Sequence, residues 1–213
     1  NENTVAGAFS LAYNTTGGRN AGLGNGSLFS NTTGNNNTAS GNRALYFNTT
    51  GYSNVAIGTE ALVSNTSRSN LVAVGDSALY SNGYGAVNAY EATENSAFGS
   101  KALYLNTTGY YNTATGSNAL RSNSTGAQNT ANGTGALISN TIGSANTSMG
   151  LNSMFYNSSG NNNTGIGNGA LTFNTTGNNN TATGFLALNN NTTGYSNVAI
   201  GTEALLRNTD RSN

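Results

Sequence analysis

The chain has no cysteine, histidine, tryptophan or proline, and each absence narrows what it can do. Without cysteine there are no disulfides, no thiolate nucleophiles and no zinc–thiolate sites. Without histidine, the commonest general base near neutral pH and the commonest transition-metal ligand are both missing. Only scattered carboxylates could carry acid–base chemistry. We therefore expect a protein that is not an enzyme and that holds no cofactor and no metal.

Charge and long apolar runs are also scarce. Charged residues make up 7% of the chain, against roughly 25% in an ordinary soluble domain, and seven basic residues balance seven acidic ones. A chain without basic excess lacks the long-range attraction for nucleic acids and anionic lipids. One of the longest apolar runs, Leu71 to Val74, is far shorter than the ~20 residues that cross a bilayer. We expect no nucleic-acid partner and no membrane insertion of this segment.

A glycine recurs at every seventeenth position of the chain. One longer step, from Gly75 to Gly99, interrupts the series and implies an insertion of seven residues. Aligning the chain on these reference glycines exposes fixed columns, as in a repeat protein. The reference glycines are Gly7, Gly24, Gly41, Gly58, Gly75, Gly99, Gly116, Gly133, Gly150, Gly167, Gly184 and Gly201.

Two columns stand out. The seventh residue after each reference glycine is always asparagine, and the fourth is leucine, with Met154 as the one substitute. Ala or Ser precedes the leucine, and a second asparagine column lies four residues before the glycine in eleven of twelve repeats. The first asparagine column is Asn14, Asn31, Asn48, Asn65, Asn82, Asn106, Asn123, Asn140, Asn157, Asn174, Asn191 and Asn208. The leucine column is Leu11, Leu28, Leu45, Leu62, Leu79, Leu103, Leu120, Leu137, Leu171, Leu188 and Leu205.

The consensus repeat, N-T/V-A-x-G-x-x-A-L-x-x-N-T-T-G-x-x, favours one coil of a β-solenoid. Asn, Thr and Gly disfavour helix interiors, and N-T/V-A-x-G alternates like a short strand. We predict a second short strand around A-L-x-x and turns after the reference glycine and at N-T-T-G, whose glycine takes a positive φ. The predicted fold is all-β: a parallel β-solenoid, or β-roll, of about twelve coils, each seventeen residues long. At ~4.8 Å per coil the rod is on the order of 58 Å long.

The composition alone also permits a disordered, Asn-rich segment. The fixed phase of the leucine column argues against it, because a disordered chain has no use for one apolar residue at a fixed spacing. Stacked asparagine amides, by contrast, can donate and accept hydrogen bonds along a column.

The residue before each reference glycine forms a half-apolar column, which shares a face with the residue two positions earlier, opposite the small residues. Such a face suits contact between chains better than a sealed interior. We expect identical chains to associate side by side, as a homotrimer or a filament; a single-chain solenoid with a decorated face is the alternative. The apolar members are Leu23, Ile57, Val74, Phe98, Met149, Ile166 and Ile200.

The phrase SNVAIGTEAL at 53–62, with its relatives NTATGSNAL and NTASGNRAL, resembles the head repeats of trimeric autotransporter adhesins, the YadA-like family, and similar repeats of some phage tail fibres. The resemblance spans essentially the whole chain. It implies a left-handed parallel β-roll, three chains packed side by side, and an extracellular, cell-surface fibre that adheres to host surfaces, matrix or glycans. The coils of that family are usually shorter than those here, and no site residue carries over.

A longer period lies above the coils. Residues 1–70 align with 144–213, and NTTGYSNVAIGTEAL occurs unchanged at 48–62 and 191–205. We predict a single repetitive solenoid over 1–213, made of a partial unit (1–70) and a complete unit (71–213) of this higher-order repeat, and we expect a piece of a long fibre. A single duplication within a finite protein is the alternative.

The inserted residues predict a loop over 84–95 that projects from one coil, and loops on rigid scaffolds often carry recognition. Two carboxylates three residues apart could act as acid and base or ligate calcium, although a plain solvated loop is the simpler interpretation. The candidate surface residues are Tyr84, Tyr90, Glu91 and Glu94.

Three smaller expectations follow from the columns. Glu60 with Arg68, and their repeats Glu203 with Arg211, are expected to form surface ion pairs. Glycans, if attached, are expected on turn Thr or Ser hydroxyls or on the second asparagine column. The Thr columns permit an ice-binding solenoid as a less favoured function.

The sequence as a whole predicts a structural or adhesive extracellular fibre segment with a polar Asn- and Thr-rich surface. A viral or phage tail-fibre shaft is the alternative.

Overall fold

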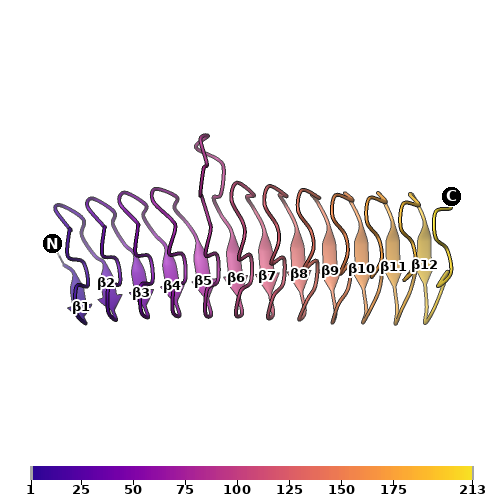
Figure 1. Ribbon diagram of the computed structural model, residues 1–213, viewed down its shortest axis with the longest axis horizontal. Coiled ribbons are helices and arrows are strands. Elements are labelled where there is room, and N and C mark those ends of the chain that lie inside the picture. Colours follow the sequence, from indigo (N-terminus) through magenta and orange to yellow (C-terminus); the bar gives the residue numbers. More distant parts are fainter. Residues whose placement is uncertain (1, 213) are drawn as a thin grey trace.

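The computed structural model describes residues 2–212 and shows coils stacked along one axis (Figure 1). Each coil contributes one short strand, and the twelve strands pair in parallel in chain order to form one sheet. No helix occurs within residues 2–212, so the predicted all-β parallel β-solenoid of about twelve coils is confirmed. The strands are β1 (Thr4–Ala6), β2 (Ala21–Leu23), β3 (Thr38–Ser40), β4 (Val55–Ile57), β5 (Val72–Val74), β6 (Ser96–Phe98), β7 (Thr113–Thr115), β8 (Thr130–Asn132), β9 (Thr147–Met149), β10 (Thr164–Ile166), β11 (Thr181–Thr183) and β12 (Val198–Ile200).

The register places equivalent residues of successive repeats side by side. Ala39 pairs with Ala56 across β3 and β4, and Ala73 pairs with Ala97 across β5 and β6 despite the longer connection between them. The inserted residues leave the solenoid between these strands, so they do not disturb the register. The same strand register therefore holds from β1 to β12.

The core is built from the alanine and leucine columns. In the middle of strands β2 to β12 a small residue such as Ala56 or Ala114 points inward and is buried, while its neighbours on both sides face outward; in the terminal strand β1 the middle residue, Val5, is exposed. The leucine column is fully buried from Leu28 to Leu188, and only its ends, Leu11 and Leu205, are more open. Each coil thus buries one large side chain against the coils above and below it.

The predicted second strand around A-L-x-x is wrong. This segment forms turns in which the leucine and the residue two positions before it have positive φ, as at Leu45 (52°) and Arg43 (57°). Left-handed residues bend the chain sharply, which a narrow coil needs, and leucine tolerates this conformation better than a β-branched residue. The backbone still bonds between coils: Leu45 N donates to Ala61 O at 3.0 Å and Phe47 N to Val63 O at 3.2 Å.

The glycine of N-T-T-G does not have the positive φ that the sequence predicts; that conformation belongs to the reference glycines, such as Gly24 with φ 129°. The N-T-T-G glycine is needed for another reason. A Cβ on Gly34 would lie 2.4 Å from the carbonyl oxygen of Gly51 and 2.4 Å from Asn31 Oδ1. The close approach of stacked backbones, rather than a turn geometry, excludes a side chain there.

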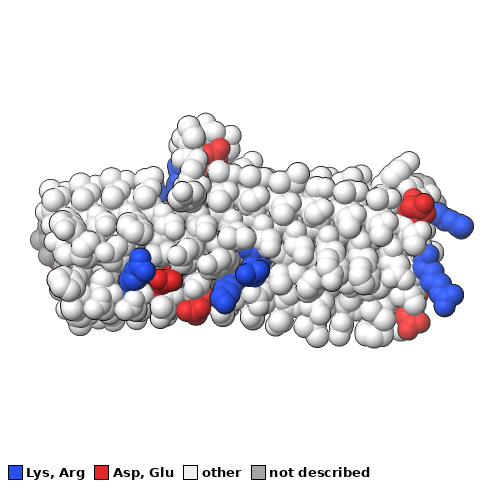
Figure 2. Space-filling model, in the orientation of Figure 1, with Lys and Arg blue, Asp and Glu red and all other residues white. Residues whose placement is uncertain are grey.

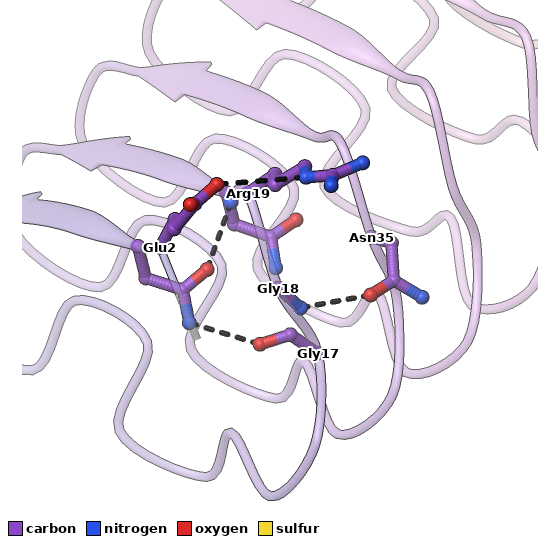
Figure 3. A network of polar contacts seen from close by, with 7 residues as sticks. Glu2, Gly17, Gly18, Arg19 and Asn35 are labelled. Atoms are coloured by element: carbon purple, nitrogen blue, oxygen red, sulfur yellow. Dashed lines mark hydrogen bonds and ion pairs between the residues drawn. The ribbon is translucent and has the colours of Figure 1, made fainter.

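Short polar contacts also join the outer edges of the coils. In the network of Figure 3, the backbone N–H of Gly18 donates to Asn35 Oδ1 at 2.8 Å, one repeat further along. Tyr52 N donates in the same way to Ser69 Oγ at 3.0 Å. Side-chain oxygens at this column therefore extend the inter-coil bonding beyond the strands.

Two adjacent glycines test the argument from close approach. A Cβ on Gly17 would lie 2.4 Å from Gly34 O, whereas a Cβ on Gly18 would meet nothing nearer than Asn35 Oδ1 at 3.7 Å. We expect Gly17→Ala to destabilise the first coils by about 1–3 kcal/mol through overpacking, and Gly18→Ala to change stability by less than about 0.5 kcal/mol. Hydrogen exchange of the Thr15 and Thr16 amides, which both donate to Thr32 O, measures the effect locally. Equal effects of the two substitutions would contradict this explanation.

Candidate functional site

The first asparagine column forms two chains of side-chain hydrogen bonds inside the solenoid, one from Asn14 to Asn65 and one from Asn82 to Asn208. Asn123 Nδ2 donates to Asn106 Oδ1 at 2.8 Å and to Gly126 O at 2.9 Å, and Asn123 Oδ1 accepts from Asn140 Nδ2 at 2.8 Å. The asparagines of this column from Asn31 to Asn191 are fully buried. They hold successive N-T-T-G turns together and are closed to ligands.

The second asparagine column is equally buried and bonded. Asn129 Nδ2 donates to Gly143 O at 2.8 Å, and Asn129 Oδ1 accepts from the backbone N–H of Asn146 at 3.0 Å. The expectation that this column could carry glycans is wrong, because its amides have no access to solvent.

The first Thr of N-T-T also serves the stack. Thr32 Oγ1 donates to Thr49 O and Thr49 Oγ1 donates to Thr66 O, each at 3.0 Å. The proton of each hydroxyl is therefore committed to the next coil. In most coils this hydroxyl is thus not free to donate to ice or to another surface.

The inserted loop is the one feature that projects from the rod, above β5 (Figure 1). Inter-coil bonding resumes at Ala92, whose N–H donates to Thr108 O at 3.0 Å and whose carbonyl accepts from Asn82 Nδ2 at 2.9 Å. Ala92 thus takes the place of an N-T-T-G glycine. Thr93 and Glu94 belong to the regular coil, and residues 85–91 form the projection.

Glu91 shapes the loop from within. Its carboxylate accepts hydrogen bonds from Val87 N at 2.7 Å, from Asn88 N at 2.9 Å and from Asn88 Nδ2 at 2.9 Å. The bond from the Asn88 side chain, followed by the two backbone bonds, lowers the pKa of Glu91 below 4.5. Its carboxylate is engaged in the loop rather than paired with Glu94, and no group of three or more His, Cys, Asp or Glu within residues 2–212 is arranged to hold a metal ion.

The structure separates the candidate loop residues. Tyr84 lies on one flank, in a hollow shared with Phe47, Thr49 and Thr66. Tyr90 and Glu94 lie on the other flank, in a groove of about 450 Å³. Two of the four predicted residues therefore meet in one site.

The groove gains its remaining walls from residues that the sequence analysis did not select as a site. Tyr52 and Tyr111 line it from coils on either side of the insertion, and Arg68 lies between them. Tyr90 packs edge-on against Tyr110, with ring centroids 5.5 Å apart and an interplanar angle of 80°. The overhanging loop and the rod surface together form the groove.

The repeat is also irregular at this point. Arg68 stands in the N-T-T-G glycine column and Leu71 in the second asparagine column. The first column is broken too. Asn82 Nδ2 bonds to Ala92 O, as its equivalents bond to the N-T-T-G carbonyls, but it makes no bond to Asn65 Oδ1, which is the one buried side-chain polar atom of residues 2–212 without a partner. The substitutions at Arg68 and Leu71 are readable in the sequence, whereas the unpaired Asn65 Oδ1 appears only in the structure, and together they mark the groove.

The expected ion pairs are wrong. Glu60 pairs with Arg43, one repeat earlier, at 2.8 Å, and not with Arg68. Arg19 and Glu2 form the other ion pair found within residues 2–212, at 3.6 Å (Figure 3). A spacing of one coil brings side chains together on the rod surface, whereas eight residues lead around the coil. Charged groups are otherwise sparse on the visible face (Figure 2).

An aromatic edge was also missed. Phe29 and Tyr46 stack with centroids 4.7 Å apart and an interplanar angle of 6°, and Tyr156 and Phe173 stack at 5.3 Å and 13°. These residues occupy the fifth and sixth positions after the reference glycines, where apolar residues recur irregularly. The rod thus has a second partly apolar surface besides the outward face of the strands.

No protein-family model, no curated protein and no solved structure matches the chain. Within the described part of the chain, no helix has the length and apolar character to span a membrane.

The buried asparagine chain generates a prediction. Asn123→Ala removes both donors from Asn106 Oδ1 and Gly126 O, and leaves Asn106 Oδ1 buried without a partner. We expect a loss of unfolding free energy of about 1–3 kcal/mol, measured by urea denaturation. Asn208→Ala, at the more open end of the same column, is the control and should cost less than about 0.5 kcal/mol. Equal losses would contradict a role of burial in the chain of amides.

Glu91 generates a prediction on pH. Because its folded pKa is lowered, its hydrogen bonds stabilise the loop above the ordinary pKa of 4.5, and this stabilisation is lost as pH falls through the lower folded value. We expect the protection of the Val87 and Asn88 amides against hydrogen exchange to fall over that range. In Glu91→Gln the protection should not depend on pH. A pH-dependent loss that persists in Glu91→Gln would assign the effect to another group.

Proposed function

We propose that this chain is a non-enzymatic, structural and adhesive segment of an extracellular fibre. The observation that carries the proposal is the unbroken register of all twelve coils, in which each repeat contacts its neighbours through backbone bonds and buried asparagine chains. A solenoid of this kind is stable as an array and extends in one direction, so it spans distance economically.

The surface supports a role in contact rather than in catalysis. It carries few charges (Figure 2), and the chain as a whole is rich in Asn, Thr, Ser and Gly. The carboxylates do not gather into a catalytic or metal-binding group within residues 2–212. We place the segment at the cell surface, with host surface, matrix or glycans as its targets; a viral or phage tail-fibre shaft would use the same rod.

Association of three identical chains side by side is part of the proposal. The outward strand face keeps large apolar side chains half-exposed along the rod, among them Leu23 (44%), Ile57 (43%) and Phe98 (43%). Such a stripe on one face of a continuous sheet favours burial against a second copy. Because the register is the same in every coil, the apolar stripe of one copy can contact that of another along the full length of the rod.

Ice binding has less support. The regular Thr hydroxyls donate to carbonyls of the next coil, as Thr32 does to Thr49 O at 3.0 Å. The outward strand positions mix Thr with Val, Leu and Phe. The flat hydroxyl array that would order water is therefore interrupted.

Antibodies raised against the purified chain test the fibre role. Electron microscopy of intact cells or particles of the source should show label along filaments at the surface. Label confined to the interior of cells would overturn the proposal.

Self-association yields the quantitative prediction. Sedimentation of the purified chain should give about 65 kDa, three times the 21.6 kDa of one chain. Ile57→Lys with Ile166→Lys on the strand face should yield monomers, because two charges would be buried at each contact. Phe47→Lys with Phe173→Lys on the aromatic edge is the matched control, with similar exposure (46% and 44%), and should leave the trimer intact. A monomeric chain, or dissociation by the control pair instead, would refute the proposed interface.

A further inference from the structure

We propose that the groove under the inserted loop binds a short neutral oligosaccharide. This inference deepens the adhesive part of the proposed function by naming a site and a ligand class. The groove combines a volume of about 450 Å³, within the range of small-molecule sites, with three tyrosines, Tyr52, Tyr90 and Tyr111, that each remain about half exposed.

The size and shape of the groove fit a chain of sugar rings. Tyr52 and Tyr111 belong to coils three repeats apart, which corresponds to roughly 14 Å along the rod. Between them run the side chains of the intervening coils, and Tyr90 overhangs from the loop. A sugar presents apolar C–H faces to aromatic rings and hydroxyls at its edges, so a groove with rings at its ends and polar groups between them matches it.

The groove contains both hydrogen-bond donors and hydrogen-bond acceptors. Arg68 supplies up to five N–H donors and Glu94 supplies carboxylate acceptors, and within residues 2–212 neither side chain is in an ion pair or a hydrogen bond. Their opposite charges cancel locally. The hydroxyls of a neutral sugar can accept from Arg68 and donate to Glu94, and such a ligand leaves the two charges balanced.

The groove is held in shape before any ligand arrives. Tyr90 rests edge-on against Tyr110, and Tyr110 against Tyr111, with centroids 5.5 Å and 5.2 Å apart. The stem of Arg68 passes Gly83, where a Cβ would lie 3.1 Å from Arg68 Cγ. Fixed aromatic walls reduce the entropy that binding would cost.

The repeat pattern is irregular at this groove. The inserted residues, Arg68 in place of glycine and Leu71 in place of asparagine all fall within two successive coils, and the buried Asn65 Oδ1 loses its partner there. Elsewhere the columns run for many coils without such a cluster. A local departure from an otherwise regular repeat pattern is typical of a functional site.

The chain carries its own matched control for the experiment. Tyr195 repeats Tyr52 in an identical fifteen-residue phrase and is similarly exposed, 57% against 52%, but no inserted loop lies above it within residues 2–212. Its backbone N–H even makes the same bond, to Ser212 Oγ at 3.0 Å. A substitution at Tyr195 therefore reports the general effect of losing this tyrosine.

The probe is an array of neutral, carboxylated and sulfated oligosaccharides, applied to the purified full chain. We expect binding of neutral members, followed by titration of the strongest of them with detection by tyrosine fluorescence. Tyr52→Ala and Tyr111→Ala should each weaken binding at least about tenfold, whereas Tyr195→Ala should leave it unchanged. Deletion of residues 85–91, which restores the regular spacing of the reference glycines, should abolish binding.

Thermal unfolding of each variant shows whether it is folded. If either Tyr52→Ala or Tyr111→Ala does not fold, the other variant still tests the groove. Absence of binding to any neutral oligosaccharide, binding of acidic members only, or equal weakening by Tyr195→Ala would overturn the assignment. If the chain forms trimers and its antibodies label surface filaments, but it binds no neutral sugar, this inference alone is rejected and the fibre proposal stands.

Discussion

The hydrogen bond between equivalent residues of adjacent coils is the interaction on which the whole molecule depends. It occurs in the strands and between buried amides, as from Asn123 to Asn106. A single coil cannot offset the entropy of ordering its own backbone with the one leucine that it buries. Each coil is therefore a template for the next, and stability belongs to the array.

The same stacking sets strict limits on side-chain size. Where backbones approach most closely, as at Gly34 beneath Gly51 O, even a methyl group is excluded. Where the coil bends, leucines such as Leu45 adopt a left-handed conformation, because the bend and the core contact are needed at the same residue. The repeated composition of small residues, amides and leucine thus reflects packing, and it leaves the outer faces free to vary.

That freedom explains where functional features lie. The outward strand face carries a half-exposed apolar stripe, the aromatic edge carries stacked rings, and the inserted loop overhangs a groove. None of these three features is required for the stacking of the coils. A rod with a regular interior can present such surfaces at fixed distances along its axis, which suits the fibre role that we propose.

The sequence by itself determined the period, the parallel stack, the inward alanines and leucines and the stacking of the first asparagine column, because these features repeat from coil to coil. Tertiary structure decided what depends on contacts within one coil or around it: A-L-x-x bends rather than forming a strand, the N-T-T-G glycine is required by the neighbouring carbonyl, and Glu60 meets Arg43. The site divides in the same way. An inserted loop that carries Tyr90, with Glu94 close to it, could be predicted from the broken period. Tyr52, Arg68 and Tyr111 join this site only because folding brings residues many positions apart to one edge of the rod.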